Sequence, residues 1–121
     1  MPYKMQKLEE GIRAAVSFID AINKQDPVLL ESLLDDFCIL ETCYKDEIYK
    51  GYNAVKNYYE SFFLQYPDQR ITVKEIHNMG KKILFYCMIE SEEDHYVQTA
   101  CMIYIEVKKG KLIYINLFSK K

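Results

Sequence analysis

Two carboxylates and one histidine are the residues of this chain whose chemistry could drive a reaction. Glu41 and Glu90 lie in or at the end of apolar runs that read as strands, and His77 lies in an alternating run. A carboxylate and an imidazole that meet in a pocket can carry out general acid–base catalysis. A shift of one residue in strand register would move each side chain to the opposite face of a sheet. We therefore treat them as candidate catalytic residues, with a position on the surface or at a dimer rim as the alternative.

A metal site is a weaker interpretation of similar residues. His77, His95 and Glu90 could supply three ligands, but the two histidines lack the short spacing that is typical of metal motifs. The chain also has no glycine-rich phosphate loop and no nucleophile elbow. We expect neither a metal nor another cofactor.

Four cysteines could in principle form a redox or metal site. Cys38, Cys43, Cys87 and Cys101 each lie inside an apolar, strand-like run, and none of them forms a CxxC pair. Redox and metal motifs place close pairs of cysteines on turns, where the thiolates can converge. We therefore expect buried, reduced thiols that serve the core.

Composition restricts the classes of function that remain. The chain has 121 residues, half of them hydrophobic, which is enough for one domain spanning residues 1–121 with a single core. Its net charge is -2, and its sixteen basic residues are scattered among eighteen acidic ones. This balance argues against nucleic acid and anionic membranes as partners. No apolar run approaches about 18 residues and the N-terminus lacks the apolar centre of a signal peptide, so we expect a cytoplasmic protein.

The stretch from Gly51 to Pro67 predicts a helix with an aromatic buried face. Its apolar residues recur at i, i+4, i+7 and i+11, which places them on one side of a 3.6-residue repeat. Gly51 marks the start of the helix, and Pro67 prevents its continuation. The predicted stripe consists of Val55, Tyr59, Phe62 and Tyr66, with Tyr58 and Phe63 on its flanks.

Two further helices and a series of strands are expected around this helix. A stripe of Leu8, Ile12, Ala15, Ile19 and Ile22 predicts a helix from about Lys4 to Lys24. Asp26 followed by Pro27 can cap and start a short helix, which we extend to Asp35 and Asp36. Strands are expected at Phe37–Tyr44, Ile71–Asn78, Lys82–Ser91, His95–Lys108 and Lys111–Ser119, with a short edge strand within Lys45–Lys50.

The runs Lys82–Ser91 and His95–Lys108 are apolar on both faces of the expected strands, as Lys82–Ser91 illustrates. Residues 83, 85, 87 and 89 are apolar, and so are residues 84, 86 and 88 between them. An antiparallel sheet in a monomer usually keeps one polar face. We therefore expect the helices to cover one face of the sheet and a second subunit to cover the other.

Three segments together resemble the nuclear-transport-factor-2-like superfamily, and most of all its SnoaL-like branch. They are FIDAINKQDPVLLESLLDDFCILE, GYNAVKNYY and the closing GKLIYINLF, and the resemblance covers nearly the whole chain. It implies an α+β fold in which a cone-shaped, curved antiparallel sheet wraps around three N-terminal helices, commonly as a dimer through the outer face of the sheet. It also implies a pocket between sheet and helices, for which we expect Phe18, Ile22, Thr42, Tyr59, Phe62, Ala100, Met102 and Ile115 as lining.

The superfamily includes ketosteroid isomerase and polyketide cyclases alongside binding proteins without catalysis, so fold alone does not assign a reaction. The resemblance to the isomerase places Phe18 at the position of an oxyanion-hole tyrosine. It places Thr42 at the position of the proton-shuttling carboxylate and Met102 at the position of the oxyanion-hole acid. None of these three supplies the required group. The cyclases usually rely on an aspartate near the end of the last strand, where this chain offers only Asn116 and Ser119. The resemblance therefore argues against both reactions as those enzymes perform them.

The sequence thus favours a small homodimeric protein that binds a hydrophobic small molecule without catalysis. An enzyme of the cyclase or isomerase kind, using Glu41 or Glu90 together with His77, is the alternative. A protein-interaction module that uses the outer face of the sheet is the third possibility. Two titratable groups that converge in the cavity would favour the enzyme. A closed apolar cavity with one or two polar anchors would favour the binding protein, and a filled cavity would favour the interaction module.

Overall fold

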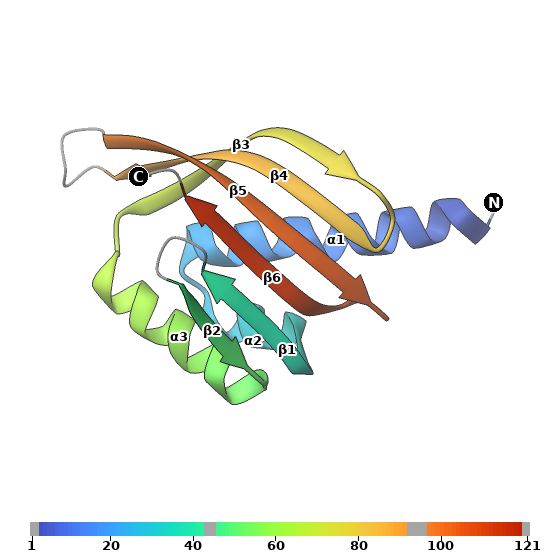
Figure 1. Ribbon diagram of the computed structural model, residues 1–121, viewed down its shortest axis with the longest axis horizontal. Helices are drawn as coiled ribbons and strands as arrows, with labels where there is room; N and C mark the ends of the chain where they lie inside the picture. The colour runs from blue at the N-terminus through green and yellow to red at the C-terminus, as the bar shows by residue number, and fades with distance from the viewer. Residues whose placement is uncertain (1–2, 43–45, 92–96, 120–121) are drawn as a thin grey trace.

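The computed structural model shows three helices packed against one face of a curved six-stranded sheet (Figure 1). It describes residues 3–42, 46–91 and 97–119. Cys43, Tyr44 and His95 lie outside the described residues, and so does the turn expected after Ser91. The elements in chain order are α1 (Tyr3–Lys24), α2 (Pro27–Leu33), β1 (Leu34–Thr42), β2 (Glu47–Lys50), α3 (Tyr52–Gln65), β3 (Gln69–Asn78), β4 (Lys82–Ser91), β5 (Val97–Lys108) and β6 (Lys111–Ser119).

The predicted α+β class and order of elements are confirmed, and one boundary was wrong. The side chain of Asp26 accepts a hydrogen bond from the Leu29 amide and caps α2, whose first residue is Pro27. We expected this helix to reach Asp36, but it ends at Leu33. Leu34 already has extended backbone angles and pairs with Leu112 of β6. A contact with a strand far along the chain therefore decides the end of the helix.

The sheet has the strand order β2-β1-β6-β5-β4-β3. Strands β3 to β6 form the expected antiparallel meander, and the short edge strand β2 pairs antiparallel with β1. One pair departs from the antiparallel pattern, because β1 runs parallel to β6, with Leu40 opposite Ile115. The first and last strands of the chain thus lie side by side in the middle of the sheet (Figure 1).

The hydrophobic core lies between the inner face of the sheet and the helices. Helix α1 packs across β3 to β6, while α3 packs on β1 and β2 (Figure 1). Alternate residues of β1, β4 and β5 enter this core, as expected for a pleated strand with one covered face. Its buried members include Ala15, Phe18 and Ile22 from α1, Val55 and Tyr59 from α3, Cys38 and Leu40 from β1, and Ile83, Phe85, Ile103, Ile105 and Ile115 from β4 to β6.

The outer face of the sheet carries apolar side chains, as the sequence pattern predicted. In β4, Ile83, Phe85 and Cys87 are buried on the inner face, whereas Leu84 and Met88 on the outer face are only half-buried. Among the described residues no helix packs on this outer side.

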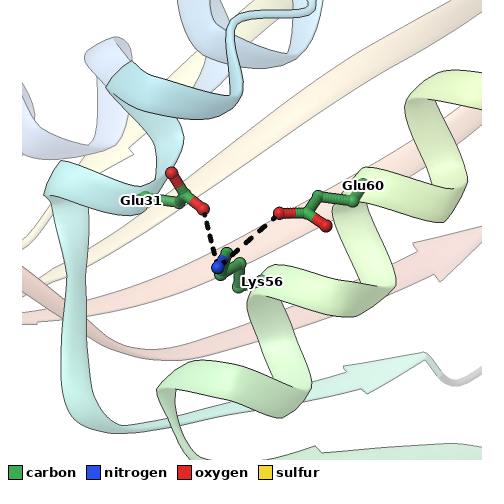
Figure 2. Close-up of polar contacts among 3 residues, drawn as sticks. All are labelled: Glu31, Lys56 and Glu60. Carbon is green, nitrogen blue, oxygen red and sulfur yellow. Dashed lines mark ion pairs between the residues drawn. The ribbon is translucent and has the colours of Figure 1, made fainter.

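Helices α2 and α3 are joined on the surface by Lys56 of α3. Figure 2 shows its ammonium group between Glu31 of α2, 3.4 Å away, and Glu60 of α3, 3.9 Å away. The hydrogen bond to Glu31 and the charges of both carboxylates raise the pKa of Lys56. Because the group is exposed, this bridge contributes little to the stability of the fold. Within the described part of the chain, no helix is long and apolar enough to cross a membrane.

Candidate functional site

A partly open cavity of about 180 Å³ lies between α1, the C-terminal half of α3 and the inner face of the sheet. The helices contribute mostly aromatic side chains to its wall, and the strands contribute mostly aliphatic ones. Its described lining consists of Phe18, Ile22, Tyr59, Phe62, Tyr66, Gln69, Ile71, Ile89, Thr99, Cys101, Met102, Ile103, Leu117 and Phe118.

Aromatic side chains pack edge to face along the helical wall of the cavity. The rings of Phe18 and Tyr59 are 5.7 Å apart at an angle of 80°, and those of Tyr59 and Phe62 are 5.9 Å apart at 69°. Edge-to-face pairs place the positive ring edge against the negative ring face, and each adds about 0.5–1.5 kcal/mol to the gain from burial. The predicted stripe of α3 therefore lines the cavity and also belongs to the core.

Polar side chains at the end of α1 hold the mouth of the cavity in place. The Asn23 amide donates to the backbone oxygen of Ile71 at 2.9 Å and accepts from the amide of the same residue at 2.7 Å. This pair of bonds imitates strand pairing and ties α1 to β3. Gln25 donates to the backbone oxygen of Tyr66 at 3.2 Å. Since Ile71 and Tyr66 both line the cavity, the sequence of this helix end sets the position of its rim.

Five of the eight predicted pocket residues lie in the cavity wall: Phe18, Ile22, Tyr59, Phe62 and Met102. Thr42 and Ile115 are fully buried in the layer around the cavity but are not part of its wall. Ala100 was placed on the wrong face. It is exposed and lines a shallow depression on the outer side of the sheet, because Thr99, Cys101 and Ile103 are the residues of β5 that face inward.

The three candidate catalytic residues lie away from the cavity and from one another. Glu41 is on the outer side of β1, where its carboxylate accepts a hydrogen bond of 3.5 Å from Asn116. His77 is exposed at the far end of β3, 3.4 Å from Glu75. Glu90 is half-buried on β4, near the opposite end of the β3–β4 pair. The structure therefore assembles no acid–base pair from these three residues.

Sequence reasoning missed several wall residues of β3 to β6. Ile71, Ile89, Thr99 and Ile103 face inward at positions that strand alternation could have indicated, had the register been known. The aromatic Phe118 closes the wall near the end of β6. Across the described residues, no group of three or more His, Cys, Asp or Glu side chains could hold a metal ion.

The described cysteines Cys38, Cys87 and Cys101 are buried and free, as predicted. Burial, and to a lesser extent the charge of Asp35, raises the pKa of Cys38 to about 12. Cys38 is therefore an unreactive core thiol, whereas Cys101 reaches the cavity.

Family membership follows from a match that spans most of the chain. The family model of the SnoaL-like domain matches residues 15–115. The chain belongs to the SnoaL-like family. No curated protein matches the sequence of this SnoaL-like domain.

Solved structures share the fold of this SnoaL-like domain at low sequence identity. Bal32a from a soil-derived mobile gene cassette has a TM-score of 0.82 at 15% identity, over 95% of this chain and 92% of its own. A proposed SnoaL-like polyketide cyclase from a Jannaschia species has a TM-score of 0.81 at 10% identity, over 93% of this chain and 86% of its own. A proposed ketosteroid isomerase from Kribbella flavida has a TM-score of 0.80 at 16% identity, over 93% of this chain and 79% of its own. Identities this low show a common fold and assign no reaction.

Proposed function

We propose that this SnoaL-like domain binds a small aromatic molecule in its cavity without acid–base catalysis. The observation that carries the proposal is the composition of the cavity wall. Among the described residues that form it, none is Asp, Glu, His, Lys or Arg, and the polar groups come from Gln69, Thr99, Cys101 and two tyrosines. Apolar walls with a few polar groups are typical of ligand sites.

The size and ring content of the cavity narrow the class of ligand. A volume of about 180 Å³ is close to that of an apolar cavity of about 150 Å³ that holds benzene. The rings of Phe18, Tyr59 and Phe62 offer both faces and edges to a flat guest. These features favour a ligand of one or two fused rings, with a hydroxyl or carbonyl group directed toward Gln69 or Thr99 at the more polar part of the wall.

Titration with a neutral naphthyl dye tests this proposal. We expect fluorescence to rise on binding and to saturate at one dye per chain. Thr99→Trp places an indole in the cavity and should weaken binding at least tenfold. Leu64→Trp is the matched control, because Leu64 is 86% exposed on α3 and is not part of the cavity wall. Equal affinity of the two variants would place the dye elsewhere and would overturn the proposed site.

The enzyme alternative would need a carboxylate or a histidine at the cavity, and the described wall contains neither. Glu41, His77 and Glu90 lie on other parts of the sheet, so an isomerase-like or cyclase-like reaction would have to use Tyr59, Cys101 or a group outside the described residues. The free, buried state of the described cysteines supports a reducing location such as the cytoplasm.

We also propose that two copies of the chain pair through the outer face of the sheet. This face carries half-buried or exposed apolar side chains on four neighbouring strands, including Ile39, Tyr86 and Met88. Met102 and Phe118 border both the cavity and the shallow depression on this outer side. Polar groups lie among them in paired form, since the Tyr104 hydroxyl donates to Glu106 at 2.9 Å and Asn116 donates to the Tyr114 hydroxyl at 2.8 Å. Apolar area interspersed with satisfied polar groups is typical of homodimer interfaces. A different protein on this face is the competing interpretation.

A further inference from the structure

Two thiols lie directly opposite each other on neighbouring strands, and one of them is in the cavity wall. Cys87 of β4 and Cys101 of β5 are partners in the antiparallel register. Both side chains are on the inner face, 3% and 8% exposed, and neither is in a disulfide. Opposed residues of an antiparallel pair have Cα atoms about 4.5 or 5.5 Å apart, and both values fall within the roughly 4.4–6.8 Å that a disulfide spans. The backbone separation therefore permits a bond between the two sulfur atoms.

Contact between the two thiols shifts their pKa values in opposite directions. A hydrogen bond from Cys87 lowers the pKa of Cys101, and this effect outweighs that of burial. The same bond, together with burial, raises the pKa of Cys87. The thiolate is the reactive form of cysteine, and Cys101 is the member of the pair that reaches the cavity, where an oxidant would meet it.

The two sulfur atoms also differ in access. Cys101 lines the cavity, whereas Cys87 does not; both residues line the shallow depression on the outer side of the sheet. An oxidant as small as hydrogen peroxide fits inside a cavity of about 180 Å³. Cys38 borders neither space, so it provides an internal comparison.

We propose that Cys87 and Cys101 form a redox-modification site, in which a peroxide converts the thiol pair to a cross-strand disulfide. In the first step the Cys101 thiolate attacks one peroxide oxygen, the O–O bond breaks, and the departing hydroxide takes a proton to become water. Cys101 is then a sulfenic acid. In the second step the sulfur of Cys87 attacks the sulfur of Cys101, and the displaced hydroxide leaves as water with the proton of Cys87. Two thiols and one hydrogen peroxide thus give one disulfide and two waters.

The modification changes the wall that a ligand would meet. An S–S bond is about 2.05 Å long, so it draws the Cys101 sulfur toward Cys87 and joins β4 covalently to β5. A disulfide closed between directly opposed strands has little freedom to relax, and strained disulfides are readily reduced. The pair therefore acts reversibly. This inference does not depend on which ligand the cavity binds.

Peptide mapping of the full chain tests the site. The protein is treated with hydrogen peroxide, unfolded in iodoacetamide, digested without reductant and analysed by mass spectrometry. We expect one cross-linked pair of peptides that contains Cys87 and Cys101, absent before treatment and lost after dithiothreitol. Cys38→Ala should retain the cross-link. In Cys87→Ala the reaction should stop at the sulfenic acid, so that dimedone labels Cys101.

Three results would overturn the proposal. Alkylation of both thiols in the treated wild-type protein would show that no bond forms. A cross-link that uses Cys38 or Cys43, or one that joins two chains on a non-reducing gel, would assign the oxidation to other partners. Dimedone on another cysteine of Cys87→Ala, with none on Cys101, would contradict the order of attack. The wild-type map gives the main result even if the variant does not fold.

Discussion

Cys38 carries a titratable group into the centre of the hydrophobic core. Its thiol is fully buried on the inner side of β1, and its pKa is raised to about 12 from an ordinary value near 9. Between these two values the unfolded chain loses the proton while the folded chain keeps it. The unfolded state is therefore favoured as pH rises, and the stability that this thiol contributes is fully present only below about pH 9.

We predict that Cys38→Ala flattens the alkaline part of the stability profile. A group that stays protonated only in the folded state lowers the free energy of unfolding by about 1.4 kcal/mol for each pH unit. The difference in stability between wild type and Cys38→Ala should therefore shrink by about 2 kcal/mol between pH 9 and 10.5. Urea unfolding across this range measures it. The loss of stability from removing the Cys38 side chain does not depend on pH. Parallel plots of unfolding free energy against pH for the two proteins would therefore contradict the prediction.

At the scale of elements, α1 and the turn after β3 touch backbone to backbone. Gly11 lies in the helix, and a Cβ atom added to it would be 1.9 Å from the carbonyl oxygen of Gly80. This distance is far below any normal contact, and the obstructing atom belongs to the main chain. Gly11 thus allows the helix to approach the end of the sheet where the turns between β3 and β4 and between β5 and β6 lie together.

We predict that Gly11→Ala destabilises the fold even though alanine favours helices. The higher helix propensity contributes up to about 1 kcal/mol, but separating the helix from the turn loses contacts along the core and costs about 1–3 kcal/mol or more. Asp20→Ala is the control, since Asp20 is exposed on the same helix and its replacement should change stability by less than about 0.5 kcal/mol. Urea unfolding compares the two variants. Equal stabilities would show that the turn moves aside without cost.

Local patterns predicted most elements, and tertiary pairing decided the rest. Capping residues and periodicity placed α2 and α3, because these signals act within a few residues. The early end of α2 at Leu33 depends on pairing between Leu34 and Leu112, which no local signal encodes. The same reason explains why the cavity wall was predicted only in part. The prediction placed Ala100 in the cavity wall, but its neighbour Thr99 is the residue of β5 that points inward. Which residues of β5 point inward is determined only when the sheet assembles.

At the scale of the whole molecule, the apolar outer face predicts the oligomeric state. A stable homodimer typically buries about 800 Å² on each subunit. We expect wild-type protein to sediment as a dimer at tens of micromolar. A two-fold interface includes every substitution twice, so Tyr86→Lys buries two unpaired charges and should weaken the dimer at least tenfold.

The matched control for the dimer is Leu64→Lys, which replaces another exposed apolar residue, on α3 away from the sheet. It should leave the dimer intact. A wild-type chain that sediments as a monomer at these concentrations would remove the dimer proposal. A dimer that Leu64→Lys weakens and Tyr86→Lys does not would place the interface on the helical side instead.

The parallel pairing of β1 with β6 also governs the order in which the chain can fold. Glu41 and Asn116, neighbours in the finished sheet, are separated by 75 residues of sequence. During synthesis β1 therefore emerges long before β6, the strand that pairs with its open edge. Closing so long a loop is slow, and unpaired strand edges associate with other chains. Refolding should thus be limited by docking of β6, and truncating the chain before Lys111 should yield aggregates.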